Sequence, residues 1–65
     1  MQYVKIYDFE SRDKLDSRNM ERIPVKGDYI YLFTHQNAYK VAAVVFNSDN
    51  TFSEICVYLD LNEKF

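Results

Sequence analysis

The chain has 65 residues and a formal net charge of −2, and it contains six Tyr, five Phe, one His, one Cys, one Gly and one Pro. This length predicts one domain with a small core, because a chain of this size buries only about 60% of the surface that its unfolded form exposes. A single cysteine excludes an internal disulfide, and one His with one Cys is a poor basis for structural zinc. We therefore expect neither a metal nor another cofactor.

Charge is unevenly distributed along the chain. Residues 1–26 carry six basic and five acidic side chains (+1), whereas residues 27–65 carry two basic and five acidic ones (−3). The acidic second half disfavours nucleic-acid binding there, since that affinity depends on Lys and Arg that neutralise phosphates. Cys56 lies between Ile55 and Val57 and no signal peptide is recognisable, so we expect a reducing, cytoplasmic compartment. No apolar run approaches membrane-spanning length.

Residues 2–9 predict a first strand, because Val4 and Ile6 alternate with Tyr and Lys. The following segment mixes charges of both signs and has only Leu15 and Met20 as apolar anchors. It lacks sustained helical periodicity. We therefore expect a long charged loop over residues 10–24, irregular from 10 to 22 with at most one or two helical turns.

The sequence Val25-Lys26-Gly27-Asp28 predicts a type II turn with Gly27 at the position that requires positive φ. Three β-type runs follow, at residues 28–34, 39–47 and 52–61, separated by four-residue connections. This arrangement predicts a three-stranded antiparallel meander. With the first strand added, the expected fold is all-β, a small barrel or half-barrel.

The middle run contains an unbroken apolar stretch, VAAVVF at residues 41–46. Because it has no polar position, we expect it to be the central strand and to be covered on both sides. The chain beyond Leu61 is expected to fray.

Alternation along the meander divides its side chains between two faces. The expected core face holds Ile30, Leu32, Val41, Ala43, Val45, Ile55, Val57 and Leu59. The opposite face then holds Tyr29, Tyr31, Phe33, Ala42, Val44, Phe46, Cys56 and Tyr58. This second set could form a patch larger than monomers usually expose. Either the first strand and the long charged loop cover this patch, with Leu15 and Met20, or the patch binds a partner.

Two segments, KIYDFES at residues 5–11 and VKGDYIYL at residues 25–32, resemble the opening half of an SH3 domain. The resemblance implies an SH3-like barrel in which Tyr7 and Phe9 line a groove for proline-rich peptides. It also implies that Asp13 and Asp16 pair with a basic residue of the ligand. The family's tryptophan pair and its late Pro/Tyr segment are absent from this chain.

The composition favours binding over catalysis, because acid, base and nucleophile cannot be assembled from one His and one Cys. We expect His35 to be a solvated turn residue and Cys56 to be an apolar filler without an electropositive setting. The leading hypothesis is a non-catalytic protein-binding module whose partner is another protein or a second copy of the chain. Its expected contact residues, which pleating would place on one face, are Tyr31, Phe33, Phe46 and Tyr58.

The alternative hypothesis is a single-strand nucleic-acid binder that stacks bases on Tyr and Phe. Its phosphate contacts would have to come from the basic residues of the first half, which are Arg12, Lys14, Arg18, Arg22 and Lys26.

Overall fold

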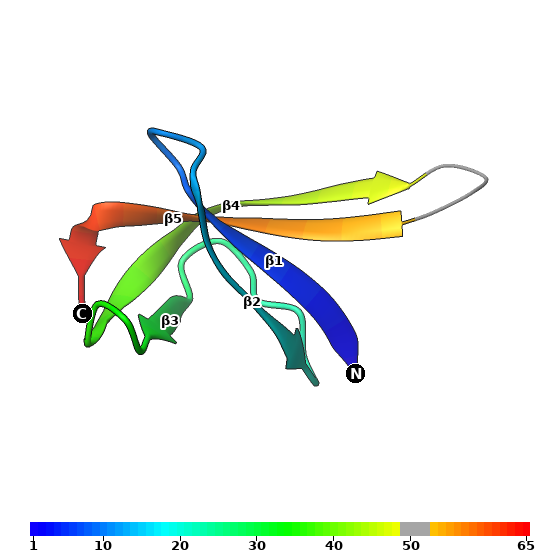
Figure 1. The fold of residues 1–65 in the computed structure, drawn as a ribbon, viewed down its shortest axis with the longest axis horizontal. Helices are drawn as coiled ribbons and strands as arrows, with labels where there is room; N and C mark the ends of the chain where they lie inside the picture. Colours follow the sequence, from blue (N-terminus) through cyan, green and yellow to red (C-terminus); the bar gives the residue numbers. More distant parts are fainter. Residues whose placement is uncertain (49–52) are drawn as a thin grey trace.

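The computed structural model describes residues 1–48 and 53–65, and its regular elements are all strands. The strands are β1 (Gln2–Asp8), β2 (Lys14–Met20), β3 (Tyr29–Leu32), β4 (Asn37–Ser48) and β5 (Ser53–Lys64). They form one sheet with the order β2-β1-β5-β4-β3 (Figure 1). The predicted all-β class is therefore confirmed.

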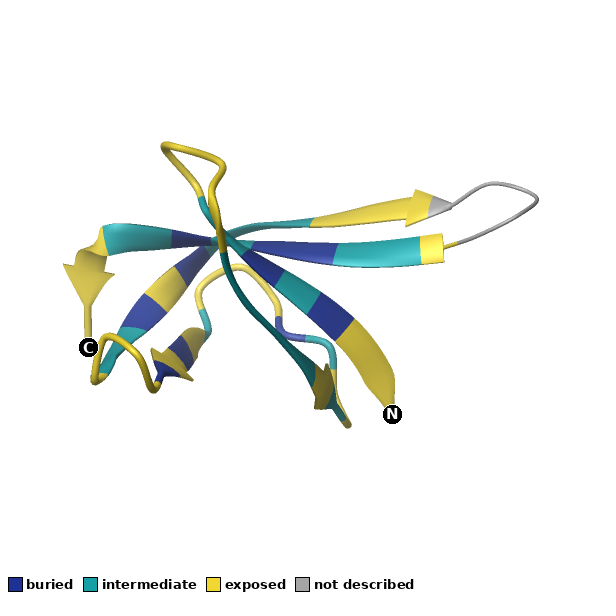
Figure 2. Cartoon of the chain, in the orientation of Figure 1, coloured by how far each residue is buried: buried dark blue, intermediate teal, exposed yellow. Residues whose placement is uncertain are grey.

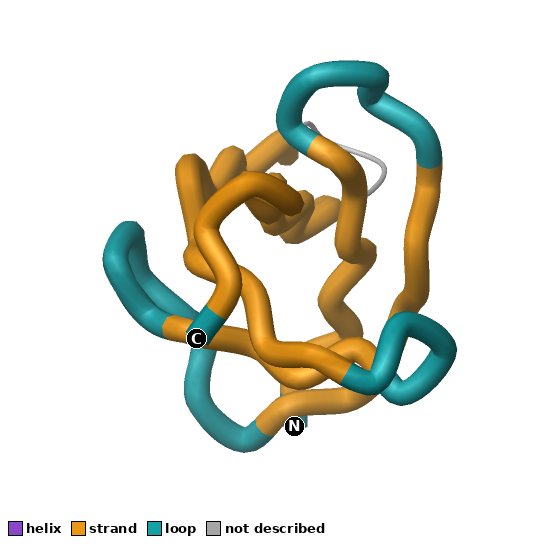
Figure 3. Tube along the Cα trace, turned by 90° about the vertical axis from the view of Figure 1, so that its left-hand side faces the viewer, coloured by secondary structure: helices purple, strands orange, loops and turns teal. Residues whose placement is uncertain are grey.

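The predicted meander is present: β3 pairs antiparallel with β4, and β4 pairs antiparallel with β5. The first strand joins this meander in an unexpected way, because β1 lies parallel to β5, with Val4 opposite Ile55 and Ile6 opposite Val57. The sheet is therefore mixed. It curls strongly around a common interior and forms a half-barrel (Figure 3), with β2 and β3 as its outer strands.

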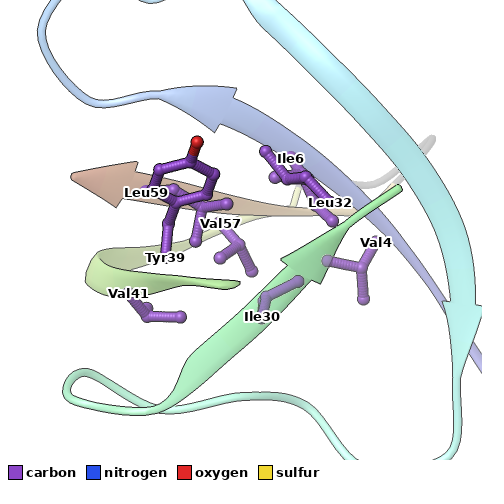
Figure 4. Close-up of a cluster of buried hydrophobic side chains, with 8 residues drawn as sticks. All are labelled: Val4, Ile6, Ile30, Leu32, Tyr39, Val41, Val57 and Leu59. Carbon is purple, nitrogen blue, oxygen red and sulfur yellow. The ribbon is translucent and has the colours of Figure 1, made fainter. Parts of the chain in front are cut away.

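The core lies on the concave face of this curled sheet (Figure 4). Four strands contribute two buried side chains each, and these are Val4, Ile6, Ile30, Leu32, Tyr39, Val41, Val57 and Leu59. Cross-strand partners point to the same face, so the pairs Ile30–Tyr39 and Val41–Leu59 stack inward together. Each fully buried aliphatic side chain contributes roughly 1.5–3 kcal/mol of transfer free energy.

A β-bulge in β4 changes which apolar residues face the core. The register shifts between Val41 and Ala43, so that one extra residue is accommodated there. After the bulge Val44 lies opposite Val57 and packs against the core, whereas Val45 lies opposite Cys56 and is 37% exposed. The prediction that Ala43 and Val45 belong to the core face is wrong, because the bulge inverts the alternation.

The apolar run in β4 is also less covered than its composition predicted. In the sheet order β5 is the central strand, and β3 pairs with β4 only over residues 37–40. Beyond Val41, β4 and β5 form an arm that projects from the half-barrel, and its outer part is exposed (Figure 2). The expectation of a central strand covered on both sides is therefore wrong for this part of β4.

The segment expected to be irregular contains a strand, β2, which pairs antiparallel with β1. Leu15 and Met20 do pack against the core, as their apolar character predicted. The strand itself was missed because two successive inward positions are polar: Asp16 lies opposite Ile6, and Arg18 lies opposite Val4. No apolar alternation marks such a strand in the sequence.

The C-terminal residues are ordered, contrary to the expected fraying. Strand β5 continues to Lys64, and the N–H of Phe65 donates to the carbonyl of Ala38 at 2.9 Å. The Phe65 ring also meets Tyr29 edge to face, with ring centroids 5.3 Å apart. These contacts fasten the end of the chain to β3 and β4.

The predicted turn before β3 is confirmed. Gly27 has φ +100°, and the N–H of Asp28 donates to the carbonyl of Val25 at 3.0 Å, which closes the four-residue turn. The space around Gly27 is open, because a Cβ placed there would meet no atom within 4 Å. The turn therefore selects glycine through its backbone angle alone.

Gly27→Ala should lower the free energy of unfolding by about 1 kcal/mol, because an L side chain is strained at this φ. Urea denaturation followed by circular dichroism measures this change. Gly27→Asn is the matched variant and should cost less, since asparagine tolerates positive φ better than alanine does. An unchanged midpoint in Gly27→Ala would show that the turn relaxes without cost.

Candidate functional site

The open edge of β4, residues 42–47, is the strongest candidate for a binding surface. Its ladder partner within the described chain is β5 on one side only. The other side faces a groove of about 550 Å³. This groove is lined by Ile23, Pro24, Val25, Lys26, Ala42, Ala43, Val44 and Phe46. Only one of these side chains is charged.

Hydrogen bonds between the segment before β3 and strand β4 explain why the groove exists. The N–H of Gly27 donates to the carbonyl of Val41 at 3.0 Å, and the N–H of Val41 donates to the carbonyl of Asp28 at 2.7 Å. These bonds fasten the segment before β3 to β4 just ahead of the open edge. Two apolar side chains remain largely exposed at the groove, Val25 at 56% and Phe46 at 63%.

The two outer strands of the sheet are protected in ways that the β4 edge is not. Strand β3 has only four residues, and Arg18 of β2 donates to the carbonyl of Tyr31 in β3 at 3.0 Å. Arg18 thus connects the two outer strands, β2 and β3, across the seam where they face each other. Its Nε also donates to the Asp16 carboxylate at 3.1 Å, which fixes the position of the guanidinium. Residues 42–47 contain no charged residue and no proline, which are two common means of blocking edge pairing, and the bulge lies only at the start of this edge.

The predicted aromatic face does not form as one surface. Tyr31 and Phe33 make an edge-to-face pair at 5.0 Å, with the Arg18 guanidinium 5.8 Å from the Phe33 ring centre. Phe46 lies opposite Ile55 on the core side of the sheet, whereas Tyr58 lies opposite Ala43 on the other side. The prediction that pleating places all four on one face is therefore wrong, because the bulge moves Phe46 to the core side.

A separate aromatic cluster forms where β1 meets β5. Tyr7 stacks on Tyr58 at 5.5 Å, and Phe9 meets Tyr58 edge to face at 6.5 Å. The Arg12 guanidinium lies 5.1 Å from the Tyr58 ring centre and 5.3 Å from that of Phe9. Partial burial raises the pKa of Tyr7. The residues expected to form the alternative groove, Tyr7 and Phe9, therefore do come together, with Tyr58 between them.

The two acids expected beside that groove are separated. Asp16 lies in β2 on the concave side of the sheet, and its hydrogen bond from Arg18 lowers the pKa of its carboxyl. Asp13 lies in the exposed turn between β1 and β2, where its carbonyl accepts a 2.9 Å bond from the N–H of Asp8. Asp16 is thus engaged within the chain rather than presented to a ligand.

The basic residues needed for nucleic-acid binding are similarly engaged in part. Arg18 is paired with Asp16, and Arg22 is paired with Asp28 at 3.0 Å. The Asp28 carboxylate also accepts a hydrogen bond from the N–H of Val25, which is the main reason that its pKa is lowered. Two of the five basic side chains therefore already neutralise acids within the chain.

His35 is exposed in a turn as expected, and Cys56 is buried as expected, although its thiol has a polar partner. Cys56 is buried, and its thiol donates to Glu54 Oε1 at 2.9 Å, while Lys5 Nζ lies 3.2 Å from Glu54 Oε2. Burial, then this bond, raises the pKa of the Cys56 thiol to about 11. His35 is exposed in the turn before β4, 3.0 Å from the Thr34 hydroxyl. Residues 1–48 and 53–65 contain no group of three or more metal-ligating side chains.

Stability should fall between about pH 9 and about pH 11, because the unfolded chain ionises its thiol near 9 while the folded chain keeps it protonated to about 11. The folded state then binds more protons, so rising pH favours unfolding. Cys56→Ser should remove most of this slope in urea midpoints measured across the range. Tyr7 and Lys5, whose pKa values are also raised, account for a residual slope above about pH 10. If the urea midpoints of the wild type and of Cys56→Ser fell equally with pH, the Cys56 thiol would not be the group responsible.

Comparison of the chain with protein-family models, with curated proteins and with solved structures gives no match. The described residues also contain no helix that is long and apolar enough to cross a membrane. The SH3 resemblance therefore remains a likeness of two short segments. The chain is a small all-β protein built on a strongly curled, five-stranded half-barrel.

Proposed function

We propose that the chain is a non-catalytic protein-binding module that accepts an extended segment of a partner along the open edge of β4. The observation that carries this proposal is Phe46, which is 63% exposed on an uncharged strand edge beside an apolar groove. Natural proteins rarely leave such an edge unprotected, because it is a template for pairing with another chain.

Binding in this mode divides affinity and specificity between backbone and side chains. The free N–H and C=O groups of residues 42–47 hydrogen-bond the added strand, whatever its sequence. The groove between β4 and residues 23–26 then selects an apolar side chain from that strand, because its lining is almost entirely apolar. Lys26 is the one charged residue at the groove.

Phe46→Ala should weaken partner binding by at least about tenfold, or 1.4 kcal/mol, because a large, exposed aromatic anchor is lost from the contact. Proteins captured by the wild-type chain from cell extract are quantified and then titrated against purified wild-type and variant chains. Phe65→Ala is the control, since Phe65 is an exposed aromatic on another part of the fold. Equal affinity for the wild type and Phe46→Ala would contradict the proposed site.

A second candidate surface is the cluster of Tyr7, Phe9 and Tyr58, favoured because the three rings do pack together. In an SH3-like module these rings would hold a proline-rich peptide, which presents a preformed extended helix to aromatic surfaces. Phe9→Ala distinguishes the two surfaces: it should abolish binding to a synthetic proline-rich peptide if this cluster is the site, while Phe46→Ala leaves that binding unchanged.

A further inference from the structure

The occupant of the β4 edge can be specified further if the proposed binding mode holds. We infer that it is a second copy of the same chain, paired antiparallel through β4 about a two-fold axis at Val44. This inference rests on the proposed function and names its partner. It follows from the order of side chains along the edge.

A two-fold pairing must be centred on one residue, because only then does each face of a strand meet the same face of its copy. Centring on Val44 places Phe46 opposite Ala42 of the second copy and Val45 opposite Ala43. Phe46 and Val45 then each meet a small side chain, and Val44 meets Val44 of the second copy, as cross-strand neighbours do. Centring on Val45 would instead oppose Val44 with Phe46 and Ala43 with the polar Asn47.

The same register brings Phe46 of one copy to the groove of the other. Ala42 lines that groove together with Pro24 and Val25, so the ring of the second copy's Phe46 arrives beside a small side chain and an apolar wall. The contact is reciprocal, as a two-fold interface requires. Both exposed Phe46 side chains are covered in one step.

Electrostatic repulsion does not oppose the pairing of the two β4 edges. Each chain carries a net charge of −2, but residues 41–47 contain no charged side chain. The nearest acid on the neighbouring strand, Glu54, lies opposite Asn47 and is already paired with Lys5 at 3.2 Å. Two acidic chains can therefore meet along this edge without opposing like charges directly, which would be destabilising.

Sedimentation velocity across a concentration series tests the inference. The wild-type chain should convert from monomer to dimer, and Phe46→Glu should raise the dissociation constant at least tenfold. Phe65→Glu, which adds the same charge on another part of the fold, should dimerise as the wild type does. Circular dichroism confirms that each variant is folded. A dimer that tolerates Phe46→Glu would overturn the inference.

Disulfide trapping tests the register. In a Cys56→Ser background, a mixture of Ala43→Cys and Val45→Cys chains should cross-link on oxidation, whereas either variant alone should not, because its cysteines lie away from one another. Cross-linking of Val45→Cys alone would overturn the Val44-centred pairing. A wild-type chain that stays monomeric but binds another protein through Phe46 would overturn the inference and leave the proposed function standing. A monomer whose binding ignores Phe46 would overturn both.

Discussion

Leu59→Ala should leave the chain largely unfolded at 25 °C. Leu59 is fully buried on the central strand β5, opposite Val41. Removing a buried leucine side chain costs about 2–5 kcal/mol, through lost transfer free energy and the cavity left behind. A core of this size rarely supplies more than about 3–5 kcal/mol in total. The loss of one side chain is therefore comparable to the whole stability of the domain.

Urea titration followed by circular dichroism measures this effect, at a protein concentration low enough that association does not add stability. Leu61→Ala is the matched control, because it makes the same chemical change on the same strand at a half-buried position. Leu61→Ala should lower the free energy of unfolding clearly less than Leu59→Ala does. If Leu59→Ala were no more destabilising than Leu61→Ala, the core would be wrongly placed.

Arg18→Met should destabilise the fold by about 1–2 kcal/mol. The change keeps the apolar length of the side chain and removes the hydrogen bond from Arg18 to the carbonyl of Tyr31, which closes the seam between β2 and β3. It also leaves Asp16 without the guanidinium that lowers its pKa. Hydrogen bonds from charged groups contribute about 1.5–3 kcal/mol when well buried, and this side chain is still one quarter exposed.

Arg22→Met is the control for charge alone. Arg22 also pairs with an aspartate, but its side chain is mostly exposed, so its removal should cost little. Thermal denaturation of the two variants compares them directly. Equal melting temperatures would show that Arg18 does not bridge the seam in solution.

The sequence was sufficient for those parts of the fold that depend on local pattern. Period-2 alternation located β1 and the three strands of the meander, and the only glycine located the turn before β3. Strand β2 escaped detection because its inward residues, Asp16 and Arg18, form an ion pair instead of an apolar stripe. The bulge in β4 could not be predicted because Ala42 and Ala43 are both small and apolar. The sequence therefore fits the inward–outward alternation equally well with or without an extra residue at this point.

The candidate site was predictable only in part. The apolar run that includes Phe46 was recognised, but its edge position was not, because composition cannot show how far β3 extends along β4. The groove depends on residues 23–26 docking beside β4 through hydrogen bonds from Gly27 and Val41, and such long-range placement leaves no mark in a local pattern. Tyr7, Phe9 and Tyr58 converge for a similar reason, through the parallel pairing of β1 with β5.

Amide hydrogen exchange of residues 42–47, measured residue by residue as protein concentration rises, tests the open edge most directly. At low concentration the amides should alternate, slow where they point at β5 and fast where they point away from it. The fast amides should become slow as the second copy pairs with the edge, and should remain fast in Phe46→Glu. Uniform protection at the lowest concentration, or fast amides that no concentration and no bound protein can slow, would contradict the account.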